Sequence, residues 1–123
     1  MIIGMKDVYY NVSNMKLSID FYTKVLGMNI QFETDYWTSL QLDSLTIGLH
    51  WTESNPVPAM PRDSHGAHSG ATLTLLSDNI SSDKQMLVDN NVNIIGQLDE
   101  EFGEVIVFQD PDGNVLKSMN PKY

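Results

Sequence analysis

The sequence of 123 residues contains no cysteine and only 7 basic residues. Without cysteine the chain can form neither disulfides nor a thiolate metal site, and it cannot use a cysteine nucleophile. No stretch approaches the ~20 apolar residues of a membrane-spanning helix, and residues 1–6 lack the basic and long apolar regions of a signal peptide. We therefore expect a cytoplasmic protein that does not associate with membranes.

The shortage of basic residues leaves a formal net charge of −9, because 16 residues are acidic. Such a field repels nucleic-acid phosphates and anionic lipid headgroups, so we expect no nucleic-acid partner. If the charge is concentrated around a cleft, it favours cationic partners, whereas charge spread over the surface only keeps the protein soluble. The hydrophobic content of 41% suits one compact domain, or two small halves packed together.

The first half of the chain is predicted to contain a strand, a helix and three further strands. Asn14 or Ser13 can cap the helix, and Gly27 suits the left-handed residue after it. Apolar residues recur along the helix at spacings of four, three and four, which places them on one face. The predicted elements are a strand at Ile2–Val12, a helix at Met15–Leu26, and strands at Ile30–Glu33, Trp37–Leu42 and Leu45–Trp51.

The second half repeats this order after a linker at residues 52–69, where three prolines and Gly66 disfavour regular structure. Ser82 and Gln85 form a possible capping box, and Asn91 takes the left-handed position after the helix. The predicted elements are a strand at Ala71–Leu76, a helix from Ser81 or Ser82 to Asn90, and strands at Val92–Leu98, Gly103–Gln109 and Val115–Met119. We therefore predict an internal duplication of βαβββ modules, residues 1–51 and 70–123, within a single domain of residues 1–123.

A curved four-stranded module cannot cover its own concave face, so two modules must pair, within one chain or between chains. The predicted fold is α+β, with the two βαβββ modules forming an incomplete curved barrel around a cleft. Along the first strand, alternation places Tyr9 and Asn11 on the face of Asp7, toward the cleft, and Val8 and Tyr10 on the other face.

Two motifs near opposite ends of the chain carry a family resemblance. Residues 108–114 read Phe-Gln-Asp-Pro-Asp-Gly-Asn, a hairpin turn in which Asp112 can bond its own backbone and Gly113 supplies a positive φ. Residues 18–27 contain a Ser-x-x-Phe-Tyr motif followed by Leu-Gly. Together these motifs resemble the last hairpin and the opening helix of the glyoxalase/bleomycin-resistance/extradiol-dioxygenase superfamily, the vicinal oxygen chelate proteins. The resemblance implies the paired-module fold, and a dimer in many small members.

The resemblance also implies four metal-ligand positions, one on the first and one on the last strand of each module, which carry His or Glu in metal-using relatives. In this chain these positions hold Asp7, Gly48, Ala71 (or Thr72 if the alignment shifts by one residue) and Lys117. Only Asp7 can ligate a metal as it stands, and the Lys117 ammonium opposes a dication. His50 is a possible substitute ligand, but two ligands do not complete a shell. We therefore expect no metal and no cofactor, and an ion pair between Asp7 and Lys117 in place of the metal.

The remaining histidines and the aromatic residues have open roles. His65 and His68 have a His-x-x-His spacing, but no helix fixes them and no acidic third ligand stands at a telling distance, so we expect solvated loop residues. His50 is either a hydrogen-bonded core residue or a pocket group. Aromatic residues on strands or strand edges either line the cavity or pack in the core. The candidate ligand-binding residues are Asp7, Tyr9, Trp37, His50, Trp51, Phe102 and Lys117.

Two classes of function fit this sequence. The first is a homodimeric binding protein, similar to the bleomycin-resistance branch, that holds a small aromatic or cationic molecule without metal chemistry; no catalytic residue is predicted for it. The alternative is a metal-dependent enzyme of the same superfamily, either a lyase or isomerase like the glyoxalase branch or a ring-cleaving dioxygenase. A member with a regulatory or unknown ligand is a third possibility.

Overall fold

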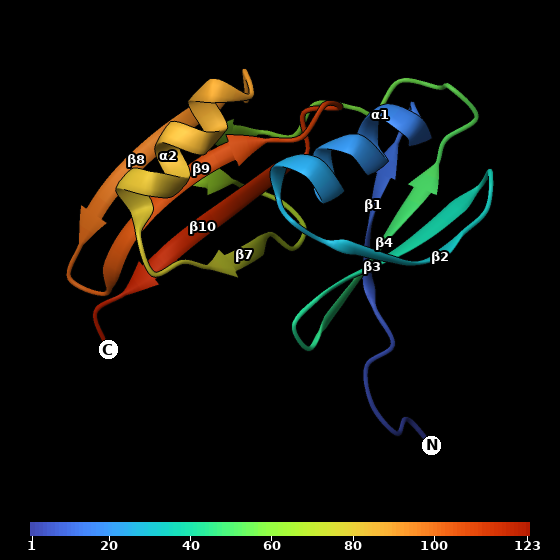
Figure 1. The fold of residues 1–123 in the computed structure, drawn as a ribbon, viewed down its shortest axis with the longest axis horizontal. Coiled ribbons are helices and arrows are strands. Elements are labelled where there is room, and N and C mark those ends of the chain that lie inside the picture. The colour runs from blue at the N-terminus through green and yellow to red at the C-terminus, as the bar shows by residue number, and fades with distance from the viewer. The chain divides into compact units, whose positions relative to one another are not determined.

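The computed structural model describes residues 1–123, which form two compact units, Met1–Val57 and Pro58–Tyr123. Each unit contains a four-stranded sheet and one helical segment in the order βαβββ, as predicted, and the fold is α+β (Figure 1). None of the helices combines the length and the apolar character that a membrane span requires.

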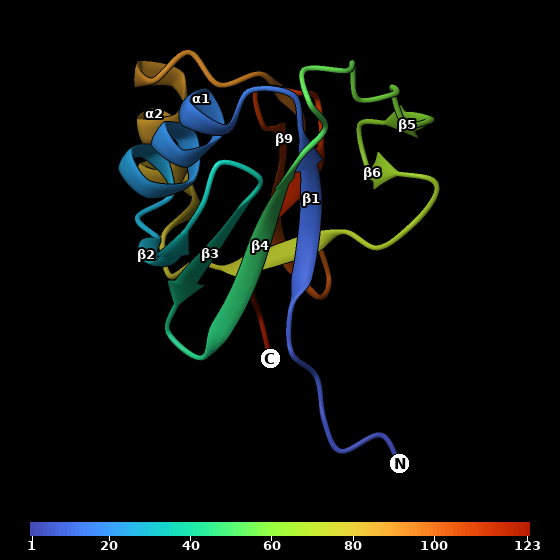
Figure 2. The same ribbon diagram turned by 90° about the vertical axis from the view of Figure 1, so that its right-hand side faces the viewer.

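The first unit is a sheet of order β1-β4-β3-β2, in which β1 and β4 are parallel and the other pairs are antiparallel. Its helical segment covers one face of the sheet (Figures 1 and 2). The elements are β1 (Val8–Val12), α1 (Met15–Asp20), η1 (Phe21–Val25), β2 (Asn29–Glu33), β3 (Trp37–Leu42) and β4 (Leu45–Trp51).

The predicted boundaries of β3 and β4 are confirmed, but the prediction that the first strand begins at Ile2 is wrong. Residues 1–7 pair with no strand, and Ile2 and Ile3 are 94% and 93% exposed. The predicted helix cap is confirmed, because the Asn14 side chain accepts the N–H of Leu17 at 3.0 Å. Gly27 has a φ of +78° after the helix, as predicted.

The helix continues as a π-helix at η1, which the sequence pattern does not reveal. The N–H of Leu26 donates to the carbonyl of Phe21, five residues earlier, at 3.1 Å. In this wider turn the adjacent residues Phe21 and Tyr22 are both buried, and their rings meet edge to face at 5.1 Å. On the neighbouring strand, Tyr10 stacks on Tyr22 at 6.4 Å. The even residues of β1 therefore face the helix, and the odd residues face away from it.

The second unit is a sheet of order β7-β10-β9-β8, with β7 and β10 parallel. Its helix starts at Ile80, where Asn79 accepts the N–H of Ser82 at 3.0 Å, so the predicted capping box of Ser82 and Gln85 is wrong. Asn91 has a φ of +58°, as predicted. The elements are β5 (Arg62–Asp63), β6 (Gly66–Ala67), β7 (Leu73–Leu76), α2 (Ile80–Asp89), β8 (Ile94–Glu100), β9 (Gly103–Gln109) and β10 (Val115–Pro121).

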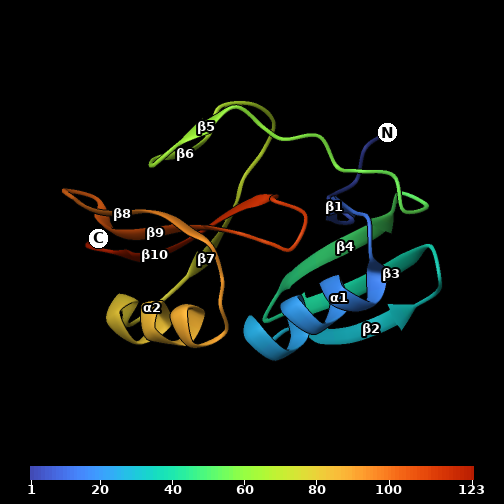
Figure 3. The ribbon, with the colours of Figure 1, turned by 90° about the horizontal axis from the view of Figure 1, so that it is seen from above.

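The predicted linker contains a small hairpin, β5–β6, that packs on one face of the second sheet. Ala67 lies against a buried cluster of Val105, Val107 and Val115. The backbone carbonyl of Ser64 comes so close to Gly96 that a Cβ there would stand 1.9 Å from the oxygen. Helix α2 covers the opposite face (Figure 3). The hairpin therefore occupies the face of the second sheet that the helix leaves open.

Candidate functional site

Three rings gather on the face of the first sheet that is turned away from α1. The Tyr9 ring meets Trp37 edge to face at 5.3 Å and His50 at 5.9 Å. In the strand register, His50 lies between Asn11 and Trp37, and Gly48 lies beside Tyr9. Tyr9 is 52% exposed and His50 is exposed. We call Tyr9, Trp37 and His50 the aromatic surface.

The aromatic surface is held in place by a glycine and two hydrogen bonds. The Trp37 indole lies across Gly48, since a Cβ at that position would stand 2.2 Å from Cζ2 of the ring. The indole N–H donates to Oγ of Ser39 at 2.8 Å. Nδ1 of His50 lies 3.0 Å from Oδ1 of Asn11, which accepts from it when Nδ1 carries the proton. The rings are therefore positioned by β1, β3 and β4 before any ligand arrives.

An ammonium and a carboxylate border the aromatic surface. Nζ of Lys6 lies 2.8 Å from Oδ2 of Asp7 and 5.8 Å from the centroid of the Trp37 ring. The Asp7 side chain is 13% exposed, whereas the Lys6 side chain is 86% exposed. The Lys6 ammonium is thus held by the Asp7 carboxylate and the face of the Trp37 indole, while its exposed side chain can also extend into solvent.

The predicted binding residues fall into separate groups. Asp7, Tyr9, Trp37 and His50 gather on one face of the first unit, with Lys6 as the link to Asp7. Trp51 belongs to the other face, where its indole N–H donates to the Ser13 carbonyl at 3.1 Å. Phe102, which is 51% exposed, and Lys117 lie in the second unit. The pairing of Asp7 with Lys117 remains a prediction.

At the four positions where the resemblance implies metal ligands, this chain carries Asp7, Gly48, Ala71 and Lys117. Gly48 is covered by the Trp37 ring, so no ligand side chain fits there without moving the indole. Lys117 holds the corresponding position of the second unit. Its side chain lies against Gly66, because its Cε is 2.7 Å from where a Cβ on Gly66 would stand. The chain offers at these positions one carboxylate, which already binds Lys6.

Asp63 in the β5–β6 hairpin is a residue that the sequence analysis missed. Its Oδ1 accepts the backbone N–H of His65 at 2.8 Å, and its Oδ2 lies 3.0 Å from Nε2 of His68. The backbone hydrogen bond and the neighbouring imidazoles hold the pKa of the Asp63 carboxyl below its usual range. The sequence signal for this contact is an aspartate two residues before His65 in a turn, where an aspartate side chain commonly accepts the backbone N–H two residues later. The two linker histidines therefore share one carboxylate.

Comparison with known proteins places the chain in a family. The family model of the Glyoxalase/Bleomycin resistance protein/Dioxygenase superfamily matches residues 4–117. Metallothiol transferase FosB of Staphylococcus haemolyticus is 31% identical over 120 residues, which cover 95% of this chain and 83% of the relative.

Two solved structures with the same fold have lower sequence identity. The fosfomycin resistance protein FosX of Listeria monocytogenes superposes with a TM-score of 0.76 at 12% identity, covering 99% of this chain and 96% of FosX. TnmS3, an antibiotic binding protein from Streptomyces sp. CB03234, superposes with a TM-score of 0.69 at 22% identity, covering 99% of this chain and all of TnmS3 (100%). Since the family model matches nearly the whole chain, the chain belongs to the Glyoxalase/Bleomycin resistance protein/Dioxygenase superfamily.

Proposed function

We propose that the protein binds a small aromatic or cationic molecule at the aromatic surface, without metal chemistry. The observation that carries this proposal is the position of the Lys6 ammonium between the Asp7 carboxylate and the Trp37 ring. These are the two groups that a ligand cation would need, and the chain already holds a cation between them. Lys6 is thus an internal stand-in for the ligand.

The physical basis is an exchange of one cation for another. A ligand ammonium that replaces Lys6 gains the same carboxylate, and a planar group attached to it gains contact with Tyr9 and Trp37. A cation over an indole contributes about 0.5–2 kcal/mol, depending on how far it is desolvated. The displaced lysine returns to water at little cost because it is already 86% exposed. The net charge of −9 attracts cations from a distance.

The metal positions support the same proposal. Gly48 and Lys117 replace two of the four ligands that the resemblance implies, and Trp37 covers the first of them. TnmS3, which has the same fold, is named as an antibiotic binding protein. Binding without a bound metal therefore agrees with the residues of this chain.

A titration of a Trp51→Phe variant tests the proposal, because Trp37 is then the single tryptophan. We expect benzyltrimethylammonium to quench its fluorescence, with or without a chelator. Lys6→Ala should tighten binding several-fold by removing the competing ammonium, and Asp7→Asn should weaken it by about tenfold. Lys84→Ala, on an exposed residue of the second unit, removes the same charge and serves as the control. Equal effects of the two lysine substitutions would contradict the proposal.

A second candidate function is favoured by the 31% identity to FosB over 95% of the chain. The name of this relative describes a metal-dependent thiol transferase, and FosX, which has the same fold, is named for fosfomycin resistance, so fosfomycin is the substrate to test. Incubation of the protein with fosfomycin, a low-molecular-weight thiol and manganese tests this reading by mass spectrometry. We expect no adduct above the rate without protein. An adduct that requires manganese and disappears in Asp7→Ala would replace the binding proposal by an enzymatic one.

We further propose that the protein is a cytoplasmic homodimer. The duplicated βαβββ order and the resemblance to small dimeric members support the dimer. Sedimentation velocity at micromolar concentration is the test, with twice the monomer mass of 13.8 kDa expected. A monomeric mass would exclude the dimer and leave the binding proposal standing.

A further inference from the structure

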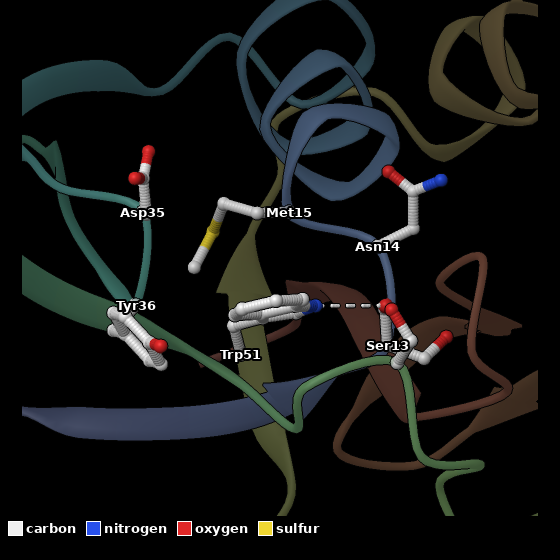
Figure 4. A pocket seen from close by; sticks show the side chains of 7 residues that line it. Ser13, Asn14, Met15, Asp35, Tyr36 and Trp51 are labelled. Atoms are coloured by element: carbon white, nitrogen blue, oxygen red, sulfur yellow. Dashed lines mark hydrogen bonds between the residues drawn. The ribbon is translucent and has the colours of Figure 1, made fainter.

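A cavity of about 450 Å³ opens in the first unit, beside the start of α1. Its walls come from the end of β1, the start of α1, the turn between β2 and β3, and the end of β4 (Figure 4). It is lined by Ser13, Asn14, Met15, Asp35, Tyr36, Trp51 and Ser54. Trp51 and the aromatic surface occupy opposite faces of the sheet, because His50 and Trp51 are neighbours on one strand. The cavity is therefore separate from the site proposed above.

Two aromatic rings form one wall of this cavity. The centroids of Tyr36 and Trp51 lie 5.3 Å apart, with the planes tilted by 59°. The Trp51 N–H already donates to the Ser13 carbonyl at 3.1 Å, so the part of the indole that remains for a ligand is the ring itself. Figure 4 shows the Met15 side chain extending toward this ring. Sδ of Met15 accepts a hydrogen bond from the Thr38 hydroxyl at 3.4 Å, which fixes the thioether.

The tight turn before β3 presents Asp35 and Tyr36 to the cavity in a fixed geometry. Thr34 closes this turn, since its N–H donates to the Trp37 carbonyl at 2.7 Å and its Oγ1 accepts the N–H of Trp37 at 3.0 Å. The Tyr36 carbonyl accepts the N–H of Trp51 at 3.0 Å, which ties the turn to β4. The backbone that carries Asp35 and Tyr36 is therefore ordered without a ligand, which lowers the entropic cost of binding.

Asp35 supplies a carboxylate that has no ion-pair partner within the protein. By contrast, Asp7 is paired with Lys6, and Asp20 is paired with Lys24 at 3.3 Å. No basic side chain lines the cavity. The charge of Asp35 is thus unbalanced within the cavity, and an organic cation would neutralise it. The two rings and the Met15 thioether suit the apolar substituents of such a cation.

We propose that this cavity is a second ligand site, which binds a small quaternary or alkyl ammonium cation between the Trp51 and Tyr36 rings and the Asp35 carboxylate. The aromatic faces recognise the positively polarised alkyl groups around the nitrogen, and the carboxylate adds a charge contact at the rim. A neutral molecule of the same shape gains the apolar contacts only. The site therefore discriminates by charge rather than by size.

A Trp37→Phe variant tests the proposal, because Trp51 is then the single tryptophan. The probes are choline and its uncharged isostere, in which carbon replaces the quaternary nitrogen. We expect choline to quench or shift the Trp51 fluorescence, and the isostere to bind at least about tenfold more weakly. In the same background, Asp35→Asn should weaken choline binding by about tenfold, and Tyr36→Ala should weaken it several-fold.

The matched control is Asp43→Asn, which removes the same charge from the β3–β4 turn of the same unit, outside the cavity. Asp43 has a φ of +53°, which asparagine also tolerates, so this substitution should leave both the fold and choline binding unchanged. Equal binding of choline and its isostere would overturn the proposal. So would equal losses in Asp35→Asn and Asp43→Asn, or no response to choline in a variant with native circular dichroism. Binding at the aromatic surface is monitored through Trp37, and binding in the cavity is monitored through Trp51. Either proposal can therefore be refuted without the other.

Discussion

Replacement of Gly48 by alanine tests whether the Trp37 indole occupies the space above Gly48, where the family resemblance implies a metal ligand. A Cβ at residue 48 would stand 2.2 and 2.3 Å from two indole carbons, so the ring must leave its present place. The indole then loses its edge-to-face contact with Tyr9, worth about 0.5–1.5 kcal/mol, and its hydrogen bond to Ser39, worth about as much. Alanine recovers about 0.5–1 kcal/mol, because glycine weakens a strand. We expect a net loss of about 1–2 kcal/mol in the free energy of unfolding.

Urea denaturation of four proteins measures this effect as a double-mutant cycle: wild type, Gly48→Ala, Trp37→Ala and the double variant. Without the indole, the closest remaining atom is Cβ of Tyr9 at 3.0 Å, so Gly48→Ala should cost little in the Trp37→Ala background. The expected coupling is about 1–2 kcal/mol. An equal cost of Gly48→Ala in both backgrounds would refute the placement of Trp37. The shifted indole should also release Lys6 and weaken the binding of benzyltrimethylammonium.

Two further predictions concern single carboxylates of the second unit. Asp110 is 5% exposed and accepts the N–H groups of Asp112 and Asn114, both at 2.9 Å. In urea denaturation, Asp110→Ala should therefore lower the free energy of unfolding by about 2–4 kcal/mol. The control Asp99→Ala removes an exposed ion pair and should cost under about 0.5 kcal/mol. Similar losses would show that Asp110 does not organise the hairpin. Asp63 has a lowered pKa, so its contribution to stability is present above the ordinary carboxyl pKa of about 4 and is lost as the pH falls through the lower folded value. The unfolding midpoint should therefore fall more steeply below about pH 4 in wild type than in Asp63→Asn, and identical profiles would contradict the assignment.

Local sequence patterns determined the order of the elements and several of their ends. Alternating residues and a two-residue turn at Asp43–Ser44 define β3 and β4 to the residue, because the side-chain period of a strand is local. Asn14 and Gly27 act on the backbone of their own turn, so the helix cap and the left-handed residue could be predicted. The turn sequence at 110–114 likewise fixes Gly113 at positive φ, and the structure adds Asp110 as a buried acceptor of the N–H groups of Asp112 and Asn114.

Partners distant in sequence decided the remaining boundaries. Ile2 and Ile3 look like strand residues, but a strand needs a neighbour to accept its backbone hydrogen bonds, and the pairing with β4 begins at Val8. Either Asn79 or Ser82 can cap a helix. The choice of Asn79 is linked to Ser77, whose hydroxyl accepts the N–H of Asn79 at 3.0 Å. Ser77 is itself held by a distant partner, because its N–H donates to the carbonyl of Met119 on β10 at 2.8 Å.

The candidate site shows the same division. The register of the β3–β4 hairpin was sufficient to place Trp37 beside His50 and Trp51 on the opposite face, so this part lay within reach of the sequence. The Lys6 ammonium over Trp37, the cover of Gly48 by the indole and the Asp63 pair with His68 join segments through side-chain contacts. Side-chain direction and distance depend on how the backbone segments pack, which no local pattern encodes. Tertiary structure alone therefore decided that the Trp37 indole lies over Gly48 and under the Lys6 ammonium.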